Sequence, residues 1–355
     1  MKDRIYVCHT FYHVYISVIK ELNIPVKMRG TASIVLSTMS NDFGDIDVRL
    51  RESGIFEDVY FFDEQEDVTH PEVMKYHKDR GNVVLNLLQR VKYTRMLARA
   101  QEKYVPVDFS NYKDIYVFCD SDPIGTYLNY KHIYYHALED GLDTLVGCDS
   151  ARVTNRGHFK IKSLMAKLNL IFIENGHSKY CLDMEVNNIE PLIYKQDNYI
   201  EVPRINLIKG VAECDKHYLM DIFIEDAEEL KSQLEINKGR KRAMILTDPV
   251  CDLQTRARIT RDIIERYCEG MSVFLKVHPR DVLDYESEEF ADCTVIKGKF
   301  PMEVMNLIPE LHMDRVISIF TVLDAIEFAD EKIRLGCDFM DEYEAPEIHR
   351  ENVGI

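Results

Sequence analysis

The chain has 355 residues, and its 46% hydrophobic content excludes an intrinsically disordered protein. The formal net charge of −17 excludes the basic footprint of a nucleic-acid-binding protein, but it leaves room for a local basic pocket that binds a small anion. Nine cysteines without a C-x-x-C pair favour neither zinc nor a disulfide framework, and they predict a reduced, cytoplasmic setting. The first residues lack the apolar core of a signal peptide, and no run reaches the ~18 apolar residues of a membrane span.

Short apolar runs alternate with helical patterns along the first half of the chain. A buried strand is predicted over residues 5–8, and the apolar residues that follow, from Phe11 to Leu22, recur at helical spacing. Further predicted strands cover residues 33–37, 59–62, 115–119 and 133–137. Strands separated by helices are typical of a parallel sheet with crossover helices.

The second half repeats this alternation. Its predicted strands cover residues 243–246, 273–276, 294–296 and 316–319, and its predicted helices cover 259–268, 302–308 and 322–329. The sequence thus predicts an α/β protein with two doubly wound, Rossmann-like domains. Because the periodicity weakens between Gly176 and Gly210, we place the boundary there, which gives domains 1–195 and 196–329. The tail, 330–355, is left open as a segment that packs back on the first domain.

Two short motifs stand directly after predicted strands, one in each domain. Glu139-Asp140-Gly141 follows the strand that ends near Ala137, and His278 follows the strand that ends at Lys276. In open α/β sheets, ligands bind at the carboxyl ends of strands, so both motifs are expected to line a cleft between the domains. There a carboxylate takes a proton from an incoming hydroxyl while a histidine stabilises the departing group, as group transfer requires.

Each motif also has a purely structural interpretation. Glu-Asp-Gly occurs in ordinary solvated turns, and for Glu139 and Asp140 both interpretations stay open. The cationic cluster of Lys276, His278 and Arg280 suits a phosphate, but in a surface loop it pairs equally with nearby acids. Pro279 disfavours a helical conformation at His278, and the strand-end setting favours the phosphate interpretation for this cluster.

Other polar residues occupy similar positions after predicted strands. Glu303 follows Pro301 at a predicted helix start, where it either stabilises the first turn or accepts hydrogen bonds from ribose hydroxyls. Ser318 and Thr321 either cap a helix or bind a phosphate at its amino terminus. The remaining residues of this kind are individually more typical of turns and caps, and they are Thr247, His9, Thr10 and Asp120.

A basic stripe contrasts with the acidic chain. Between Met74 and Tyr104 there are eight Lys or Arg residues and only two acids, and those at 92, 95, 99 and 103 share one helix face. Such a stripe suits an anionic glycan or peripheral contact with an anionic membrane surface. A solvated helix face is the simpler interpretation.

The motifs, in this order, give the chain a resemblance to bacterial sialyltransferases. It resembles the lipooligosaccharide type, glycosyltransferase family 52, and the related polysialyltransferases, in Glu139-Asp140-Gly141, in Lys276-Val277-His278-Pro279 and in Pro301-Met302-Glu303. The resemblance implies a GT-B fold with an acceptor-side first domain and a nucleotide-sugar-binding second domain. It also implies inverting transfer of sialic acid from a CMP-activated donor to a glycan acceptor, in surface polysaccharide (capsule) or lipooligosaccharide synthesis, with no cofactor and no metal site.

Roles for individual residues follow from the same resemblance. Asp140 is expected to be the general base, with Glu139 as the second choice, and His278 to protonate or stabilise the leaving phosphate. Lys276 is expected at the cytidine, Glu303 at the ribose, and Thr321 with Ser318 at the phosphate. The other donor-side residues are Pro279, Arg280 and Thr247, and the acceptor side comprises His9, Thr10 and Asp120.

One departure from the family pattern keeps other functions open. Adjacent hydroxyl residues are expected at the phosphate site, but this chain has Phe320-Thr321-Val322. One alternative is a GT-B transferase that uses a different nucleotide sugar or a polyol phosphate, and another is a non-catalytic relative that binds glycan or nucleotide. The oligomeric state stays open, with a dimer among the options.

Overall fold

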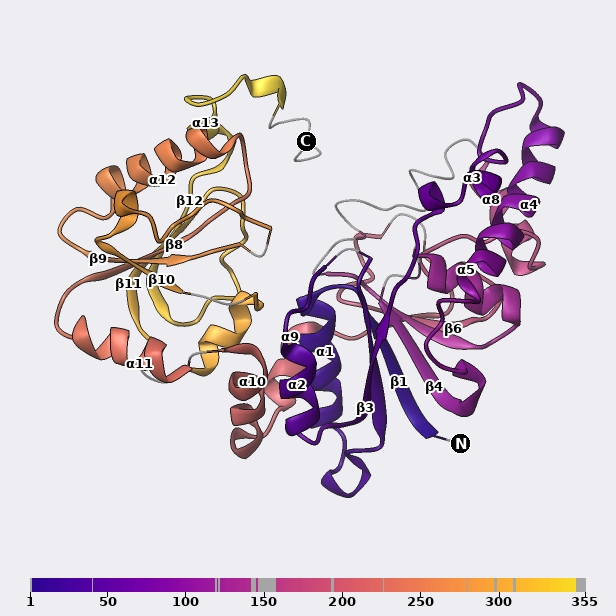
Figure 1. Cartoon of the computed structure of the whole chain (residues 1–355), viewed down its shortest axis with the longest axis horizontal. Coiled ribbons are helices and arrows are strands. Elements are labelled where there is room, and N and C mark those ends of the chain that lie inside the picture. Colours follow the sequence, from indigo (N-terminus) through magenta and orange to yellow (C-terminus); the bar gives the residue numbers. More distant parts are fainter. Residues whose placement is uncertain are drawn as a thin grey trace. The chain divides into compact units, whose positions relative to one another are not determined.

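The chain forms two compact units, each with its own parallel sheet (Figure 1). They comprise Met1–Asp215 and Lys216–Ile355. The computed structural model describes residues 2–39, 41–118, 120, 122–141, 145, 158–192, 195–225, 227–278, 280–296, 299–308 and 311–348. The predicted α/β class with two Rossmann-like sheets is therefore confirmed.

The first unit is built on a seven-stranded parallel sheet with the order β3-β2-β1-β4-β5-β6-β7. The direction of strand addition reverses between β1 and β4, which creates a topological switch point at their carboxyl ends. The central strands are apolar on both faces, as parallel strands covered by helices require, and Ile5 and Val7 are fully buried. The strands are β1 Lys2–Cys8, β2 Ala32–Ser37, β3 Phe56–Phe62, β4 Tyr112–Phe118, β5 Tyr135–Leu138, β6 Cys181–Val186 and β7 Tyr199–Glu201.

Helices cover both faces of this sheet. Figure 1 shows α1 and α2 on one face and α4 and α5 on the other. Helix α1 begins directly after β1 because the Thr10 side chain accepts a hydrogen bond from the His13 amide and caps its first turn. The helices are α1 Phe11–Leu22, α2 Ile46–Glu52, α3 Pro71–Met74, α4 Val83–Gln101, α5 Pro123–Lys131, α8 Phe159–Lys167 and α9 Arg204–Gly210, with short 3-10 turns at η1 Val26–Met28, η2 Asp67–Thr69, η3 Phe109–Asn111 and η4 Glu213–Asp215.

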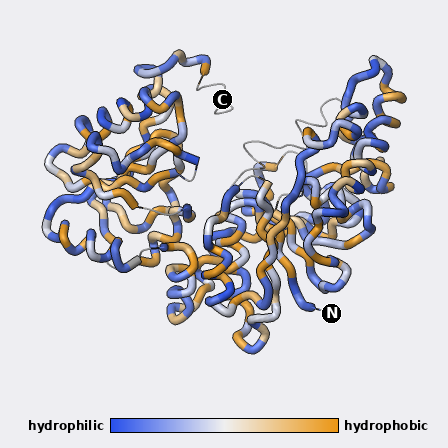
Figure 2. Tube along the Cα trace, viewed as in Figure 1, coloured by the Kyte–Doolittle hydropathy of each residue, from blue (hydrophilic) through white to orange (hydrophobic). Residues whose placement is uncertain are grey.

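The second unit repeats the plan on a smaller, five-stranded parallel sheet with the order β10-β9-β8-β11-β12. Figure 1 shows α11 and α12 on opposite faces, and Figure 2 shows hydrophobic colour concentrated along the strands between them. The strands are β8 Arg242–Leu246, β9 Ser272–Lys276, β10 Cys293–Ile296, β11 Met313–Ser318 and β12 Ala329–Arg334. The helices are α10 Lys216–Phe223, α11 Ala227–Ile236, α12 Leu253–Tyr267 and α13 Gly336–Met340, with 3-10 segments at η5 Glu288–Phe290 and η6 Met302–Leu307.

Two predicted helices are wrong. Residues 302–308 form the 3-10 segment η6 instead of an α-helix, and residues 322–328 form no helix but lead into β12. The side chain of Asn306 explains the second difference, because it donates to the Ala325 carbonyl at 2.8 Å and accepts from the Glu327 amide at 2.9 Å. These bonds satisfy backbone groups that a helix would otherwise pair within itself.

The unit boundary falls later in the chain than the predicted domain boundary. Strand β7 pairs with β6, so residues after 195 complete the first sheet. Strand β12 pairs with β11, and Phe339 and Met340 are buried in the core of the second unit. The described part of the tail that we left open therefore adds a strand and a helix to the second unit. Within the described residues no helix is both long and apolar enough to span a bilayer.

Candidate active site

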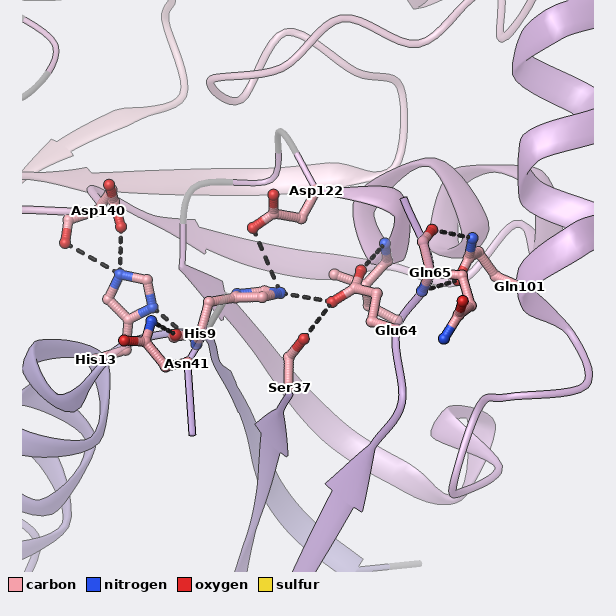
Figure 3. A network of polar contacts seen from close by, with 10 residues as sticks. His9, His13, Ser37, Asn41, Glu64, Gln65, Gln101, Asp122 and Asp140 are labelled. Carbon is pink, nitrogen blue, oxygen red and sulfur yellow. Dashed lines mark hydrogen bonds and ion pairs between the residues drawn. The ribbon is translucent and has the colours of Figure 1, made fainter. Parts of the chain in front are cut away.

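A buried ion pair lies at the carboxyl edge of the first sheet (Figure 3). His9, just after β1, places Nε2 at 2.7 Å from Glu64 Oε2 and at 3.4 Å from Asp122 Oδ2. Glu64 also accepts hydrogen bonds from Ser37 Oγ at 2.8 Å and from the Ile124 amide at 2.7 Å. Burial alone lowers the pKa of His9, but the two carboxylates outweigh it and raise the pKa to about 9. His9 is therefore a buried imidazolium at neutral pH.

A second histidine holds the carboxylate of the Glu-Asp-Gly motif. The His9 backbone N–H donates to His13 Nδ1 at 3.0 Å, so Nε2 is the nitrogen that carries hydrogen in the neutral ring. His13 Nε2 contacts both the carboxylate of Asp140 and its carbonyl oxygen, the latter at 3.1 Å. The ring is fixed from the side by stacking on Phe118, with the ring centroids 4.4 Å apart. Figure 3 shows His13 between the His9 loop and Asp140.

The protonation states of this pair suit a base. Burial lowers the pKa of His13 and keeps its ring neutral. The hydrogen bond from His13 lowers the pKa of Asp140, so the carboxylate stays ionised at neutral pH. The His13 side chain is 2% exposed and the Asp140 side chain 43% exposed. One end of the pair is thus anchored in the core, while the carboxylate is accessible to a hydroxyl of a ligand.

Glu139 has a different environment from Asp140. Its side chain is buried, and its two oxygens accept hydrogen bonds from the Asn187 amide at 2.7 Å and the Leu145 amide at 3.4 Å. The bond to Asn187 joins residues 48 positions apart, whereas Leu145 lies only six residues after Glu139. Of the two neighbouring carboxylates, Asp140 is the one that the fold leaves accessible.

Two of the predicted acceptor-side residues serve the fold. Asp120 is fully buried, and it accepts hydrogen bonds from Tyr135 Oη at 2.6 Å and from the Asn175 amide at 2.5 Å. Gly125 allows this close packing, because a Cβ there would lie 2.2 Å from the Asp120 carbonyl oxygen. Thr10 caps α1. Of the three predicted acceptor-side residues, only His9 joins the polar network around Asp140.

In the second unit, the loop after β9 holds His278 by its backbone and its ring. The His278 N–H donates to Thr247 Oγ1 at 3.0 Å, and His278 Nδ1 accepts from the Arg280 N–H at 3.1 Å. Burial and the neighbouring Arg280 lower the pKa of His278, which leaves a neutral ring with its hydrogen on Nε2. A neutral ring in this tautomer can donate a hydrogen bond from Nε2 to an anionic oxygen. Pro279 lies outside the described residues.

Lys276 is the last residue of β9, two residues before His278, and its ammonium group lies against an aromatic ring. Its side chain is buried, and Nζ lies 3.8 Å from the centroid of the Phe300 ring. Burial lowers the pKa of Lys276 to about 7, although the Coulombic effect of Glu225 opposes this shift. Arg280 is exposed. Glu303 lies in the first turn of η6, and burial raises its pKa.

The hydroxyl groups of Ser318, the last residue of β11, and of Thr321 form hydrogen bonds within the protein. Asp248 accepts hydrogen bonds from the amides of Ile319 and Phe320 at 3.0 and 3.2 Å, and from Thr321 Oγ1 at 3.0 Å. The fully buried Ser318 donates from Oγ to the Thr321 carbonyl at 2.7 Å. The helix predicted to begin near residue 321 is therefore wrong, and Asp248 already binds amides that a phosphate would meet there. Phosphate binding by Thr321 and Ser318 stays a prediction.

Sequence analysis missed His13 and Glu64. Both follow the strand-end rule that identified the motifs: Glu64 stands two residues after β3, and His13 stands in the first turn of the helix that follows β1. The bond between His13 and Asp140 joins residues 127 positions apart, and the bond between Glu64 and His9 joins residues 55 apart. No local sequence pattern reports such pairings.

Comparison with known proteins agrees with this fold. The chain is similar to the GT-B domain of a sialyltransferase from Photobacterium damselae, with 14% identity, a TM-score of 0.51, and coverage of 99% of this chain and 97% of that one. A second structure of a sialyltransferase from this organism has 14% identity and a TM-score of 0.49, with 99% of this chain and 79% of that one covered. No curated protein sequence matches significantly. At this identity the likeness shows a GT-B fold.

The model for glycosyltransferase family 52 matches residues 56–335, which include Asp140 and His278, and the chain therefore belongs to this family of glycosyltransferases.

Proposed function

We propose that this glycosyltransferase moves sialic acid from CMP-sialic acid to a hydroxyl of an acceptor glycan, with inversion and without a metal ion, in the synthesis of surface polysaccharide or lipooligosaccharide. The observation that carries the proposal is the accessible, ionised carboxylate of Asp140, which the buried His13 holds in place. The family and the two motifs support the chemistry of the donor.

Asp140 acts as the general base. Its carboxylate takes the proton of the acceptor hydroxyl while the hydroxyl oxygen forms a bond to the anomeric carbon. The bond from that carbon to the phosphate oxygen breaks at the same time, and the electron pair leaves with CMP. Attack from the face opposite the leaving group inverts the anomeric configuration.

His278 acts on the leaving group. The hydrogen on Nε2 is available because Nδ1 accepts from the Arg280 amide, and the neutral ring uses it to donate a hydrogen bond to the departing phosphate oxygen, which stabilises the negative charge that develops there. Arg280 is exposed and supplies positive charge for the same phosphate. We assign Lys276 to the cytidine and Glu303 to the ribose on the basis of the family resemblance. Ser318 and Thr321 are the least supported of the donor residues, because their hydroxyls already bind Thr321 and Asp248.

The first test is calorimetric titration of the whole chain with CMP, UMP, GMP and AMP, because binding needs no knowledge of the acceptor. Selective binding of CMP, followed by release of CMP from CMP-sialic acid in the presence of a glycan acceptor, is the expected result. Preference for another nucleotide would keep the glycosyltransferase and reject the donor. Asp140→Asn serves as the matched control, since it should bind CMP like the natural chain but transfer nothing.

A further inference from the structure

Two neighbouring helices of the first unit expose an unusual number of apolar side chains. Helix α4 exposes valines and leucines in its first half, and α8 exposes isoleucine and leucine along one side. Each of these side chains is between 51% and 65% exposed, and they are Val83, Val84, Leu85 and Leu88 on α4, and Ile161, Leu164 and Leu168 on or directly after α8. We call these seven residues the α4–α8 apolar surface. Soluble proteins rarely expose contiguous apolar patches without a binding function.

The two rows belong to one surface. Val91 of α4 and Met165 of α8 pack on the same small core, which contains Ala166, Ile171 and Ile173. On α4, Val84 and Leu88 share a helix face with Val91, because they precede it by seven and three residues. On α8, Ile161 precedes Met165 by four residues and shares its face in the same way. Each exposed row is thus continuous with the residue that its helix contributes to the shared core.

The segments that carry these apolar residues are rich in positive charge. Residues 75–103, which include α4, contain eight Lys or Arg and two acids, although the whole chain has a net charge of −17. Residues 158–170, which include α8, contain three lysines and no acid, namely Lys160, Lys162 and Lys167. The two helices also approach each other through cations, since Arg90 contributes to the lowered pKa of Lys162 after burial. Figure 2 shows hydrophilic and hydrophobic segments interleaved along this part of the chain.

We propose that the α4–α8 apolar surface docks on an anionic lipid bilayer. Apolar side chains enter the boundary between headgroups and acyl chains, while the lysines and arginines around them meet anionic headgroups. The charge pattern also selects this partner over a second copy of the chain. A two-fold interface would bring the same surface of both copies together, and the cations of one copy would then face the cations of the other. The inference goes beyond sugar transfer, and its use to the enzyme, which rests on the proposed function, is access to glycans carried on lipids.

Vesicle binding tests the proposal without donor or acceptor. The whole chain is expected to co-sediment with vesicles of phosphatidylglycerol and phosphatidylcholine and not with phosphatidylcholine alone. Binding should fall steeply toward about 1 M salt, where the Debye length is about 3 Å. Leu85→Glu/Leu88→Glu and Ile161→Glu/Leu164→Glu should each weaken binding by about tenfold or more, because each removes two apolar side chains from the interface. All four positions are exposed, so the variants should fold.

The matched control is Ile205→Glu/Ile236→Glu, which changes two apolar residues that are 44% and 71% exposed on α9 and α11. It should bind vesicles like the natural chain. Absence of binding by the natural chain, or equal loss in the control, would overturn the proposal. A dimer in light scattering that Leu85→Glu/Leu88→Glu dissociates, with no vesicle binding, would assign the surface to self-association instead. Transfer to a water-soluble acceptor should be unaffected in all variants, so a failure of the proposed function and a failure of membrane docking give different results.

Discussion

The polar edges of the two sheets use their motif residues in different ways. At the edge of the first sheet, charged side chains contact one another: His9 binds Glu64 and Asp122, and His13 binds Asp140. At the edge of the second sheet, polar side chains mostly bind backbone groups, as Thr247 does for His278 and Asp248 for the loop after β11. The contacts at the first edge therefore fix the charge and orientation of side chains, and the contacts at the second edge fix the backbone conformation of loops. We expect activity to depend on the charges at the first edge and on the loop conformations at the second.

The largest effect is expected from Asp140→Asn, which removes the accessible carboxylate at the edge of the first sheet. The amide has nearly the same shape as the carboxylate but cannot take a proton, so kcat should fall by on the order of 10⁴-fold. CMP affinity, measured by calorimetry, should stay close to that of the natural chain. Loss of CMP binding together with activity would indicate that Asp140 supports folding instead.

His278→Ala tests the second edge, and loss of the Nε2–H donor is expected to lower kcat by on the order of 10²–10³-fold if this hydrogen bond stabilises the leaving phosphate. A donor with a more acidic leaving group should recover part of the loss, because its departing oxygen carries less negative charge. Thr247→Val is the matched variant for the loop: it removes the acceptor of the His278 amide but keeps the imidazole, and it should raise KM for the donor more than it lowers kcat. A change of affinity alone in His278→Ala would contradict its role in stabilising the leaving phosphate.

His13→Phe keeps the Asp140 carboxylate but removes the hydrogen bond that orients it, so this variant tests the effect of orientation alone. Phenylalanine keeps the stack on Phe118 but cannot donate a hydrogen bond, so kcat should fall by up to about 10²-fold. His13 lowers the pKa of Asp140, and without it that pKa rises; since the base must be ionised, the acid limb of the pH–rate profile should move to higher pH. The negative charge of Asp122 and the positive charge of His9 act on the pKa of Asp140 in opposite directions, and both charges remain in the variant. His13→Gln, which restores an N–H donor, should recover most of the rate, and an unchanged pH profile in His13→Phe would exclude the positioning role.

The smallest effect concerns stability and the buried imidazolium of His9. Its pKa is about 9 in the folded chain against an ordinary value of 6.5, so the stabilisation is complete below pH 6.5 and is lost as the pH rises through 9. Urea unfolding followed by circular dichroism should show a loss on the order of 1–3 kcal/mol between these two pH values. Glu64→Gln should flatten this dependence. An equally steep dependence in Glu64→Gln would place its origin elsewhere.

Much of the architecture was predictable because it follows from local patterns. Fully apolar runs gave the central strands, and the strands observed at residues 32–37 and 272–276 lie within one residue of those predicted. Strands β6, β7 and β12 were missed, and β12 is polar: it reads Ala-Asp-Glu-Lys-Ile-Arg, exposes its charged residues and pairs with one neighbour at the sheet edge. Such an edge strand carries no apolar periodicity, since charge on an edge opposes pairing with other chains.

The candidate site was predictable only in part for a related reason. The strand-end rule identified Asp140 and His278 because it depends on position in a sheet, which apolar runs report. It did not distinguish Asp140, which is accessible, from Asp120, which is buried by Tyr135 and Asn175. That distinction depends on packing between segments far apart in sequence. The same is true of Ser318, which is fully buried although it follows the rule.

The contiguity of each sheet in sequence has a consequence for biosynthesis. Every strand of the first sheet lies before residue 202, and every strand of the second lies after residue 241. Within the described ranges, neither sheet contains a strand from the other unit, so the described strands of the first sheet have all been synthesised while the ribosome is still adding the second sheet. Domains generally fold as units in this order during synthesis. The carboxylate network can thus be complete on the nascent chain before the histidine of the second motif has been translated.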